Sequence, residues 1–262
     1  MNQTLEEMAR NLFKSWFVDF DPVHAKAEGR EPAGMDAETA ALFPDGLEVS
    51  ELGPIPSEWK IRSLAEVVEL ISGGTPKRSM AAYWGGDIPW FSVRDAPSHS
   101  EIFTIETSEK ITQTGVDNSA ARVLPEGTTI VTARGTVGKL ALVGVPMAMN
   151  QSCYGVRSRH PGCGIFNYFR LQRAVLGLQQ RTHGSVFDTI TRGTFSGVKI
   201  VDPPVNIAGS FDVIVGPFLR RVKLNATENL SLEATRAILL PKLLSGQLRV
   251  SAPEDFQECQ LP

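Results

Sequence analysis

The chain has 262 residues, of which 42% are hydrophobic and 21% charged, a composition typical of a globular protein with a substantial core. It contains no apolar run near the roughly 20 residues that a transmembrane helix needs, and its first residues lack the pattern of a signal peptide, so we expect a cytoplasmic protein. The net charge of −3 argues against a protein that is basic throughout. Residues 1–58 hold 12 acidic and 4 basic side chains, so the remaining 204 residues carry a net charge of +5. That part of the chain is therefore compatible with phosphate contacts.

Two N-terminal segments differ in their helical potential. In residues 3–18 apolar side chains recur at three- and four-residue spacings, which predicts an amphipathic helix. Residues 21–56 are rich in proline and glycine, so we expect an extended linker with little structure of its own. The predicted division is a spacer helix over residues 1–20 and a linker over residues 21–56.

Residues 57–204 have the pattern of a mixed α/β domain. Short apolar runs alternate with glycine, proline and serine, which is typical of strands joined by turns. Residues 165–180 have helical periodicity and predict one long helix within this domain. The predicted strands are 66–72, 88–93, 128–133, 139–145, 152–157 and 197–201.

A second long helix is predicted over residues 205–245, in a C-terminal segment of residues 205–248 that precedes a tail of residues 249–262. We expect Pro217 to kink this helix, and Pro241 and Gly246 to end it. A helix of this length is a rod of roughly 60 Å, which a globular domain does not need for its own core. Its apolar stripe is therefore predicted to pack on a partner.

The two ends of the chain show a weak internal similarity. Residues 2–6 align with residues 229–233, and the same offset places Leu12 on Leu239. Agreement over so short a stretch arises by chance about as readily as from a true repeat, so both interpretations stay open. A true repeat would mean that the same helical piece flanks the domain on both sides.

The motifs of several catalytic and metal-binding classes are missing. The three cysteines and four histidines show neither CxxC nor HExxH spacing, so we predict no metal site. Residues 135–139 (GTVGK) do not have the spacing of a phosphate-binding loop. Residues 202–205 (DPPV) lack the aromatic side chain with which an adenine methyltransferase stacks on a flipped base, and they indicate a turn into the C-terminal helix. A stand-alone enzyme is therefore not expected.

Several segments together resemble the specificity (S) subunits of Type I restriction–modification systems. The most specific match is LLPKLLSG at residues 239–246, and residues 12–20 resemble the helical region between the two domains of a full subunit. The other matching segments are residues 56–60, 71–76, 83–90, 125–128, 134–139, 150–151, 183–185 and 201–204.

This resemblance implies a mixed α/β target-recognition domain at residues 57–204, plus long α-helical coiled-coil spacer elements. Full subunits of the family carry two such domains, whereas one is found here, so the resemblance is to a half-length form. It implies a non-catalytic subunit that reads one half of a bipartite double-stranded DNA target. Methyltransferase (M) subunits would then methylate adenine in the target, and restriction/translocase (R) subunits would cleave the DNA. Those partners, rather than this chain, would bind S-adenosylmethionine, ATP and Mg²⁺.

A half-length subunit is expected to pair with itself or with another half subunit, and no membrane association is expected. With two-fold symmetry a homodimer would read a palindromic target. The alternative interpretation is a truncated remnant that acts as an oligomerising scaffold without DNA selectivity.

Polar loops supply the candidate DNA-binding side chains, because base edges need hydrogen-bonding partners and phosphates need cations. For each cation the alternative is an ordinary solvated surface residue. Trp84 and Trp90 are interpreted as core residues, and Asn150-Gln151 as either an adenine contact or a brace for a turn. The candidate DNA-binding residues are Thr75, Lys77, Arg78, Arg94, His99, Arg134, Thr136, Lys139, Gln151, Arg181, His183 and Ser185. The candidate oligomer and partner interface consists of Leu5, Leu12, Phe13, Trp16, Phe211, Asn225, Asn229, Leu232 and Leu239.

Overall fold

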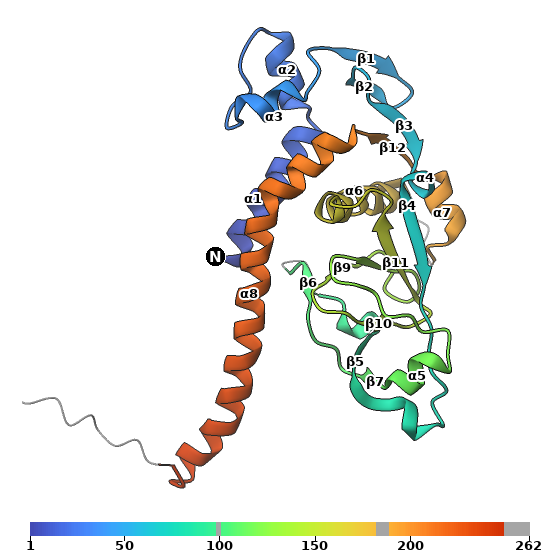
Figure 1. The fold of residues 1–262 in the computed structure, drawn as a ribbon, viewed down its shortest axis with the longest axis vertical. Helices are drawn as coiled ribbons and strands as arrows, with labels where there is room; N and C mark the ends of the chain where they lie inside the picture. The colour runs from blue at the N-terminus through green and yellow to red at the C-terminus, as the bar shows by residue number, and fades with distance from the viewer. Residues whose placement is uncertain (98–100, 182–188, 249–262) are drawn as a thin grey trace, which may run out of the picture. The chain divides into compact units, whose positions relative to one another are not determined.

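The computed structural model describes residues 1–97, 101–181 and 189–248, without the side chain of Arg181. The chain divides into two units, Met1–Lys223 and Leu224–Pro262, and each is described by itself. In chain order the elements (Figure 1) are α1 (Asn2–Phe17), α2 (Asp21–Ala27), α3 (Ala37–Ala41), β1 (Leu47–Ser50), β2 (Gly53–Pro56), β3 (Lys60–Ser63), α4 (Leu64–Val67), β4 (Val68–Ser72), η1 (Ala81–Tyr83), β5 (Trp84–Phe91), η2 (Val93–Asp95), β6 (Phe103–Thr104), β7 (Lys110–Ile111), α5 (Gln113–Asp117), β8 (Thr129–Thr132), β9 (Leu140–Val143), β10 (Ala148–Met149), β11 (Cys153–Ser158), α6 (Gly164–Arg181), α7 (Arg192–Gly197), β12 (Lys199–Asp202) and α8 (Val205–Leu244).

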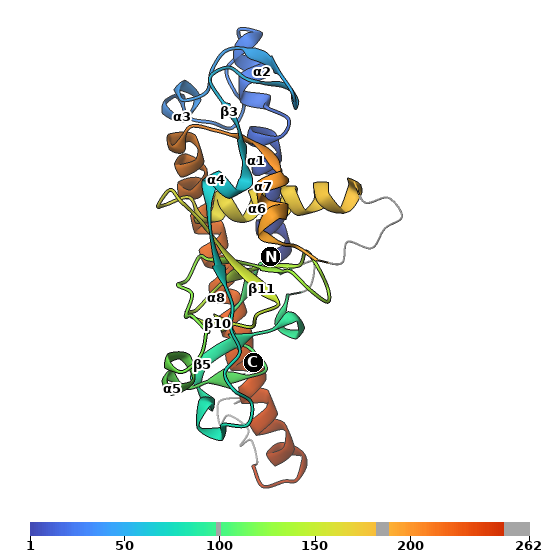
Figure 2. The same cartoon turned by 90° about the vertical axis from the view of Figure 1, so that its right-hand side faces the viewer.

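Helix α1 confirms the predicted N-terminal amphipathic helix, and its apolar face is buried in the first unit. The Phe13 ring lies 5.7 Å from the ring of Phe169 in α6 and 5.8 Å from that of Phe211 in α8. Trp16 extends the same aromatic cluster, with its ring 6.1 Å from that of Phe211. In Figures 1 and 2 α1 accordingly lies beside the first turns of α8.

Residues 21–56 are not the extended linker that their composition predicts, because they contain α2, α3 and the antiparallel hairpin β1–β2. Pro22 lies in the first turn of α2, where its missing N–H costs no helical hydrogen bond. The side chain of Asp36 caps α3, and Gly53 takes the positive φ of 98° beside the hairpin turn. Phe43 is buried in the core of the unit. Proline and glycine therefore mark caps and turns here instead of a lack of structure.

The mixed α/β fold predicted for the domain is confirmed. The largest sheet in the described ranges has the strand order β4-β11-β8-β9-β6, and α6 packs against β8, β9 and β11. A second sheet has the order β10-β5-β7, and β12 pairs with β3. Each of the six predicted strand segments contains or overlaps an observed strand. The strand predicted at residues 66–72 begins only at Val68, because a capping box of Ser63 and Glu66 starts the short helix α4.

Helix α8 confirms the second long helix but corrects two details of the prediction. Pro241 does not end it, since Ser245 donates its backbone N–H to the carbonyl of Pro241 and the helix runs to Leu244. Gly246, the other residue predicted to end the helix, follows two residues later with a positive φ of 73°. Its first part, up to Lys223, lies in the first unit, where Phe211 and Val215 are buried in the core. For this part the prediction of an external partner was wrong. The aromatic side chains of α1 and α6 cover the apolar stripe instead.

Candidate nucleic-acid interface

One edge of the five-stranded sheet gathers loops from distant parts of the sequence. Strands β4 and β8 end at this edge and β11 and β9 begin there, because each neighbouring pair in the series β4, β11, β8, β9 is antiparallel. The parallel pair β10 and β5 also ends beside it, where Gly74 donates its backbone N–H to Met149 at 2.9 Å. We name this surface the loop edge. It comprises residues 73–79, 92–95, 133–139, 150–152 and 189–192.

Main-chain hydrogen bonds join these loops into one structure. The backbone N–H of Asn150 donates to Phe91 at 2.9 Å, and that of Ala133 donates to Ser152 at 2.8 Å. The backbone N–H of Ile190 donates to Ala133 at 2.9 Å, which attaches residues 189–192 to the same place. The loops of the edge are therefore held by the sheet beneath them, as expected of a recognition surface on a rigid scaffold.

Two adjacent glycines allow this close packing. A Cβ on Gly73 would lie 1.9 Å from the carbonyl oxygen of Asn150, and one on Gly74 would lie 2.3 Å from the carbonyl carbon of Ala120. Any side chain at either position would displace the main chain of a neighbouring loop. Gly73 and Gly74 lie in a segment that resembles the specificity subunits, and this close approach gives a physical reason for the glycine pair.

Eight of the twelve candidate DNA-binding residues lie on the loop edge. Of the remaining four, His99, His183 and Ser185 lie outside the described residues, and Arg181 closes α6 with a side chain that is not described. Most of the eight side chains are exposed, while Thr75 and Lys139 are half-buried. The eight residues are Thr75, Lys77, Arg78, Arg94, Arg134, Thr136, Lys139 and Gln151.

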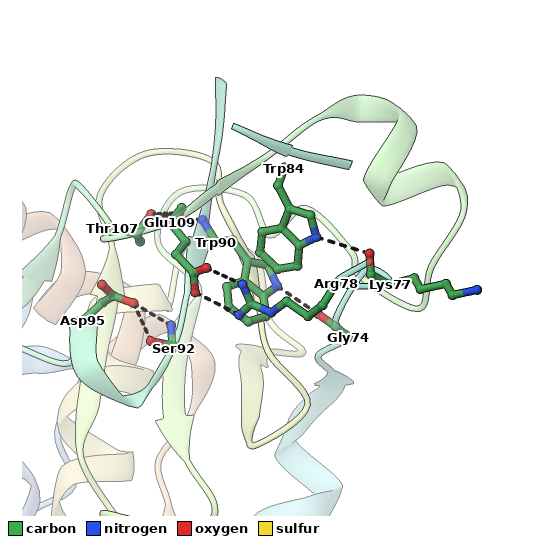
Figure 3. A network of polar contacts seen from close by, with 9 residues as sticks. All are labelled: Gly74, Lys77, Arg78, Trp84, Trp90, Ser92, Asp95, Thr107 and Glu109. Atoms are coloured by element: carbon green, nitrogen blue, oxygen red, sulfur yellow. Dashed lines mark hydrogen bonds and ion pairs between the residues drawn. The ribbon is translucent and has the colours of Figure 1, made fainter. Parts of the chain in front are cut away.

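Arg78 is the most tightly held cation of the loop edge (Figure 3). Its guanidinium forms a two-pronged ion pair with Glu109, in which Nη2 donates to Oε2 at 2.9 Å and Nη1 donates to Oε1. The same group lies over Trp84, with 3.8 Å between Cζ and the ring centroid, and 5.0 Å from the ring centroid of Trp90. Ion pairing and cation–π contact thus fix one orientation of the guanidinium plane.

Both tryptophans also hold the loop that carries Arg78. The indole N–H of Trp90 donates to the carbonyl of Gly74 at 3.0 Å, and that of Trp84 donates to the carbonyl of Lys77 at 3.4 Å. Trp90 is buried, as its interpretation as a core residue predicts, whereas Trp84 is half-buried beneath Arg78. The loop at residues 74–78 is therefore anchored at both of its ends.

The electrostatics of this cluster favour a permanently charged pair. The hydrogen bond from Arg78 holds the pKa of Glu109 below its usual value, and the nearby charge of Arg94 lowers it further. Hydrogen bonding to Glu109 likewise raises the pKa of Arg78. Glu109 is not among the residues predicted from the sequence, because its position 31 residues from Arg78 gives no local signal of the pairing.

Asn150 and Gln151, each expected either to contact adenine or to brace a turn, differ in their contacts. The side chain of Asn150 accepts the backbone N–H of Ser152 at 3.0 Å, which is the geometry of a brace for a turn. Gln151 is exposed and its side-chain oxygen accepts a hydrogen bond from the hydroxyl of Thr75. Gln151 remains a candidate base contact, whereas Asn150 serves the local fold.

The turn between β8 and β9 presents the last cluster of candidates. The buried hydroxyl of Thr132 accepts the backbone N–H of Lys139 at 2.9 Å and donates to the carbonyl of Thr136. Gly135 and Gly138 adopt φ values of 79° and 84°, which a glycine tolerates without strain. The turn therefore holds Thr136 and Lys139 in fixed positions on the loop edge.

The structure divides the candidate interface residues into two groups. Phe13, Trp16 and Phe211 are buried in the core of the first unit, and Leu5 and Leu12 pack against that core. The predicted role at an intermolecular interface was wrong for the three buried aromatic residues, because their surfaces are already covered within the chain.

The other candidate interface residues lie in the second unit. There Leu232 is 59% exposed and Leu239 is 39% exposed, while Asn229 is exposed and Asn225 half-buried. These four residues therefore stay candidates for an intermolecular contact.

Three further findings concern metal binding, membrane spans and cysteine reactivity in the described residues. Among them, no group of three or more histidine, cysteine, aspartate or glutamate side chains is arranged to hold a metal ion. None of the described helices combines the length and the hydropathy needed to cross a membrane. Burial raises the pKa of the Cys153 thiol to about 12 and that of Cys163 to about 11, so these two thiols stay protonated at neutral pH.

The protein-family comparison decides the classification. The model described as the Type I restriction modification DNA specificity domain matches residues 56–234, well over half of the chain. The chain belongs to this family. The resemblance read from the sequence is thereby confirmed.

Curated relatives and solved structures agree with that family. The chain is 28% identical to the HindI specificity subunit of Haemophilus influenzae, over 95% of this chain and 62% of that protein. It is also 28% identical to the MjaIX specificity subunit of Methanocaldococcus jannaschii, over 59% of this chain and 36% of that protein. The S subunit of a type I system from M. genitalium shares the fold, with a TM-score of 0.58 at 15% identity, covering 92% of this chain and 55% of that one. The specificity-domain chain therefore spans less than two thirds of these relatives.

Proposed function

We propose that this specificity-domain chain is the non-catalytic DNA-recognition subunit of a type I restriction–modification complex, in which it reads one half of a bipartite target. The observation that carries the proposal is the loop edge, on which eight candidate DNA-binding residues from four separate loops lie together. Family membership supports the same role.

The loop edge offers both kinds of contact that sequence-specific binding requires. Lys77, Arg94 and Arg134 are exposed cations suited to phosphates, whose neutralisation gives most of the affinity. Exposed Gln151 and half-buried Thr75 carry the hydrogen-bonding groups that distinguish base edges. A single anchored surface would therefore position the protein on the backbone and read bases at the same time.

Catalysis is proposed to belong to partner subunits. Methyltransferase subunits would supply the S-adenosylmethionine site and methylate adenine, and restriction subunits would supply the ATP and Mg²⁺ sites for cleavage. The specificity-domain chain would bind none of these cofactors itself and would act in the cytoplasm, beside its DNA. Its contribution would be the choice of the sequence on which the partners act.

The second unit supports a proposal about assembly. Leu232, Leu239 and Leu243 are exposed on its helix, so an apolar stripe is free to form a coiled-coil spacer with a second copy or with another half subunit. A symmetric pair would bring two loop edges to one DNA molecule and would read a palindromic two-part site. The length of the helical pair would then set the spacing between half-sites.

The experiment that tests this function is selection from randomised double-stranded DNA by the purified full chain, followed by sequencing of the bound fraction. The proposal predicts enrichment of a defined motif, with two parts if the chain pairs with itself. Self-association in sedimentation without any enriched motif would instead support the alternative of an oligomerising scaffold.

A further inference from the structure

The geometry of Arg78 leaves a specific set of hydrogen-bond donors unused. Its pairing with Glu109 is end-on, through one hydrogen of Nη1 and one of Nη2. This leaves the side edge of the guanidinium, formed by Nε–H and the second hydrogen of Nη2, and Arg78 has no other hydrogen-bond acceptor in the described part of the chain. The side chain as a whole is 54% exposed, which is compatible with access to this fork of two parallel donors from outside.

The charge of the pair argues against a simple phosphate contact. Arg78 and Glu109 together carry no net charge, and the carboxylate would repel a phosphate that approached the guanidinium closely. Lys77, the preceding residue, is exposed and forms no ion pair among the described residues, so it attracts the DNA backbone more strongly. The two neighbouring cations are therefore suited to different partners.

Rigidity supports the same division of roles. The guanidinium of Arg78 is held by a carboxylate, by the face of Trp84 and by a loop that both tryptophans anchor (Figure 3). A phosphate contact does not require such fixed orientation, since phosphate oxygens accept from many directions. A base contact does require it, because two donors must meet two acceptors in one plane.

We propose that Arg78 determines specificity by donating its free side fork to the O6 and N7 acceptors of a guanine in the major groove, and that Glu109 and Trp84 are positioning residues for it. This inference rests on the proposed DNA-recognition function and specifies one base of the half-site. An arginine held in this way prefers guanine, which presents two acceptors side by side, over the other bases. Lys77 contributes to affinity for any sequence.

The test applies selection from randomised DNA to four full-length proteins: the unmodified chain and the variants Arg78→Lys, Glu109→Gln and Arg157→Lys. Arg78→Lys keeps the charge but removes the two-pronged fork. Glu109→Gln keeps the fork and weakens its orientation. Arg157→Lys is the matched control, since Arg157 forms an exposed ion pair with Glu69 at 3.8 Å on strands β11 and β4, away from the loop edge. Thermal unfolding confirms that each variant is folded.

The proposal predicts that the motif of the unmodified chain contains a G·C pair whose selection depends on Arg78. Arg78→Lys should lower the preference for guanine at that position about 10-fold or more while the other positions keep theirs. Glu109→Gln should relax the same position to a smaller extent, and Arg157→Lys should leave the motif unchanged. If Arg78→Lys fails to fold, the Glu109→Gln result decides the question.

Two outcomes overturn the proposal in distinguishable ways. If the unmodified chain enriches a motif that the Arg78 and Glu109 variants leave unchanged, or weaken equally at all positions, the role of Arg78 is refuted and the proposed function stands. If the unmodified chain enriches no motif, both fail together.

A salt titration of binding to non-specific DNA gives an independent readout. Lys77→Ala should reduce the slope of log affinity against log salt by about 1, because one phosphate contact is lost. Removing the neutral pair with the double variant Arg78→Gln/Glu109→Gln should leave that slope nearly unchanged. A loss of slope in the double variant as large as that in Lys77→Ala would show that Arg78 contacts phosphate, and would contradict guanine reading.

Discussion

The two parts of helix α8 differ in what covers their apolar side chains. Up to Lys223 the helix belongs to the first unit, where Ile207, Phe211 and Val215 are completely buried. From Leu224 onward it belongs to the second unit, where Leu232 and Leu244 are 59% and 81% exposed. One continuous helix therefore serves as a core element in one unit and presents an uncovered apolar surface in the other.

This difference shows what helical periodicity can and cannot predict. The spacing of apolar residues specifies which face of a helix avoids water, and it predicted α8 along nearly its whole length. It contains no information on whether the same chain or another molecule covers that face. Phe211 is covered by aromatic residues of α1 and α6 in the same chain, and these lie far away in the sequence.

The largest expected effect on stability lies in the buried part of α8. Phe211 contacts the rings of Phe13, Phe17 and Phe169 at centroid distances between 5.4 and 5.9 Å. Phe211→Ala should lower the free energy of unfolding by about 3–5 kcal/mol, because it leaves a cavity among these rings. Urea denaturation of the full chain, followed through the unfolding of the first unit, measures this loss. Leu239→Ala is the matched control, and a similar loss there would abolish the distinction between the two parts.

A smaller effect should depend on pH. Asp212, on the buried part of α8, accepts the backbone N–H groups of Ile165 and Phe166 at 2.8 and 2.6 Å and so caps α6. Burial nevertheless raises its pKa to about 6, although these hydrogen bonds lower it. Because the folded-state pKa lies above the unfolded one, this group favours the folded state most below about pH 4, and that contribution is lost as the pH rises through 6.

The variant Asp212→Asn removes this titration. Between pH 5 and pH 8 the free energy of unfolding of the unmodified chain should therefore fall by on the order of 1–3 kcal/mol more than that of the variant. Urea denaturation at the two pH values checks the difference. Glu233→Gln, an exposed change on the second unit, should leave the dependence unaltered. Equal pH dependence in the unmodified chain and in Asp212→Asn would refute the assignment.

The smallest effect on stability is expected in the exposed part of α8. The double variant Leu232→Asp/Leu239→Asp should change the unfolding of the first unit by less than about 0.5 kcal/mol, since neither side chain is part of its core. The same variant should abolish self-association, because two carboxylates would face the apolar stripe of a second copy. Sedimentation measures the loss. A dimer that persists would exclude this stripe as the contact between copies.

The fold was predictable where one element carries a strong pattern of its own. The three long helices and the strands of the main sheet follow from apolar periodicity and from turn residues. Residues 21–56 were mispredicted because their short helices and hairpin are stabilised by tertiary contacts, such as the burial of Phe43 against Trp16 and Trp59. Propensity alone cannot foresee such contacts.

The candidate site was predictable in its members but not in its geometry. Polar loops with cations supplied the residues of the loop edge, and their spatial proximity depends on the order of the strands. Glu109 was missed because it pairs with Arg78 across the fold. Asn150 braces a turn while the neighbouring Gln151 is exposed, and this difference likewise depends on the local direction of the backbone.

The most direct test of DNA recognition by this chain is to co-express it with the methyltransferase subunit of its own restriction system, in a host that lacks adenine methylation. Sequencing of the genomic DNA then reports every methylated adenine. We predict methylation confined to one bipartite motif and dependent on the presence of the chain. Methylation that is absent, or that follows the same pattern when the chain is omitted, would contradict the account.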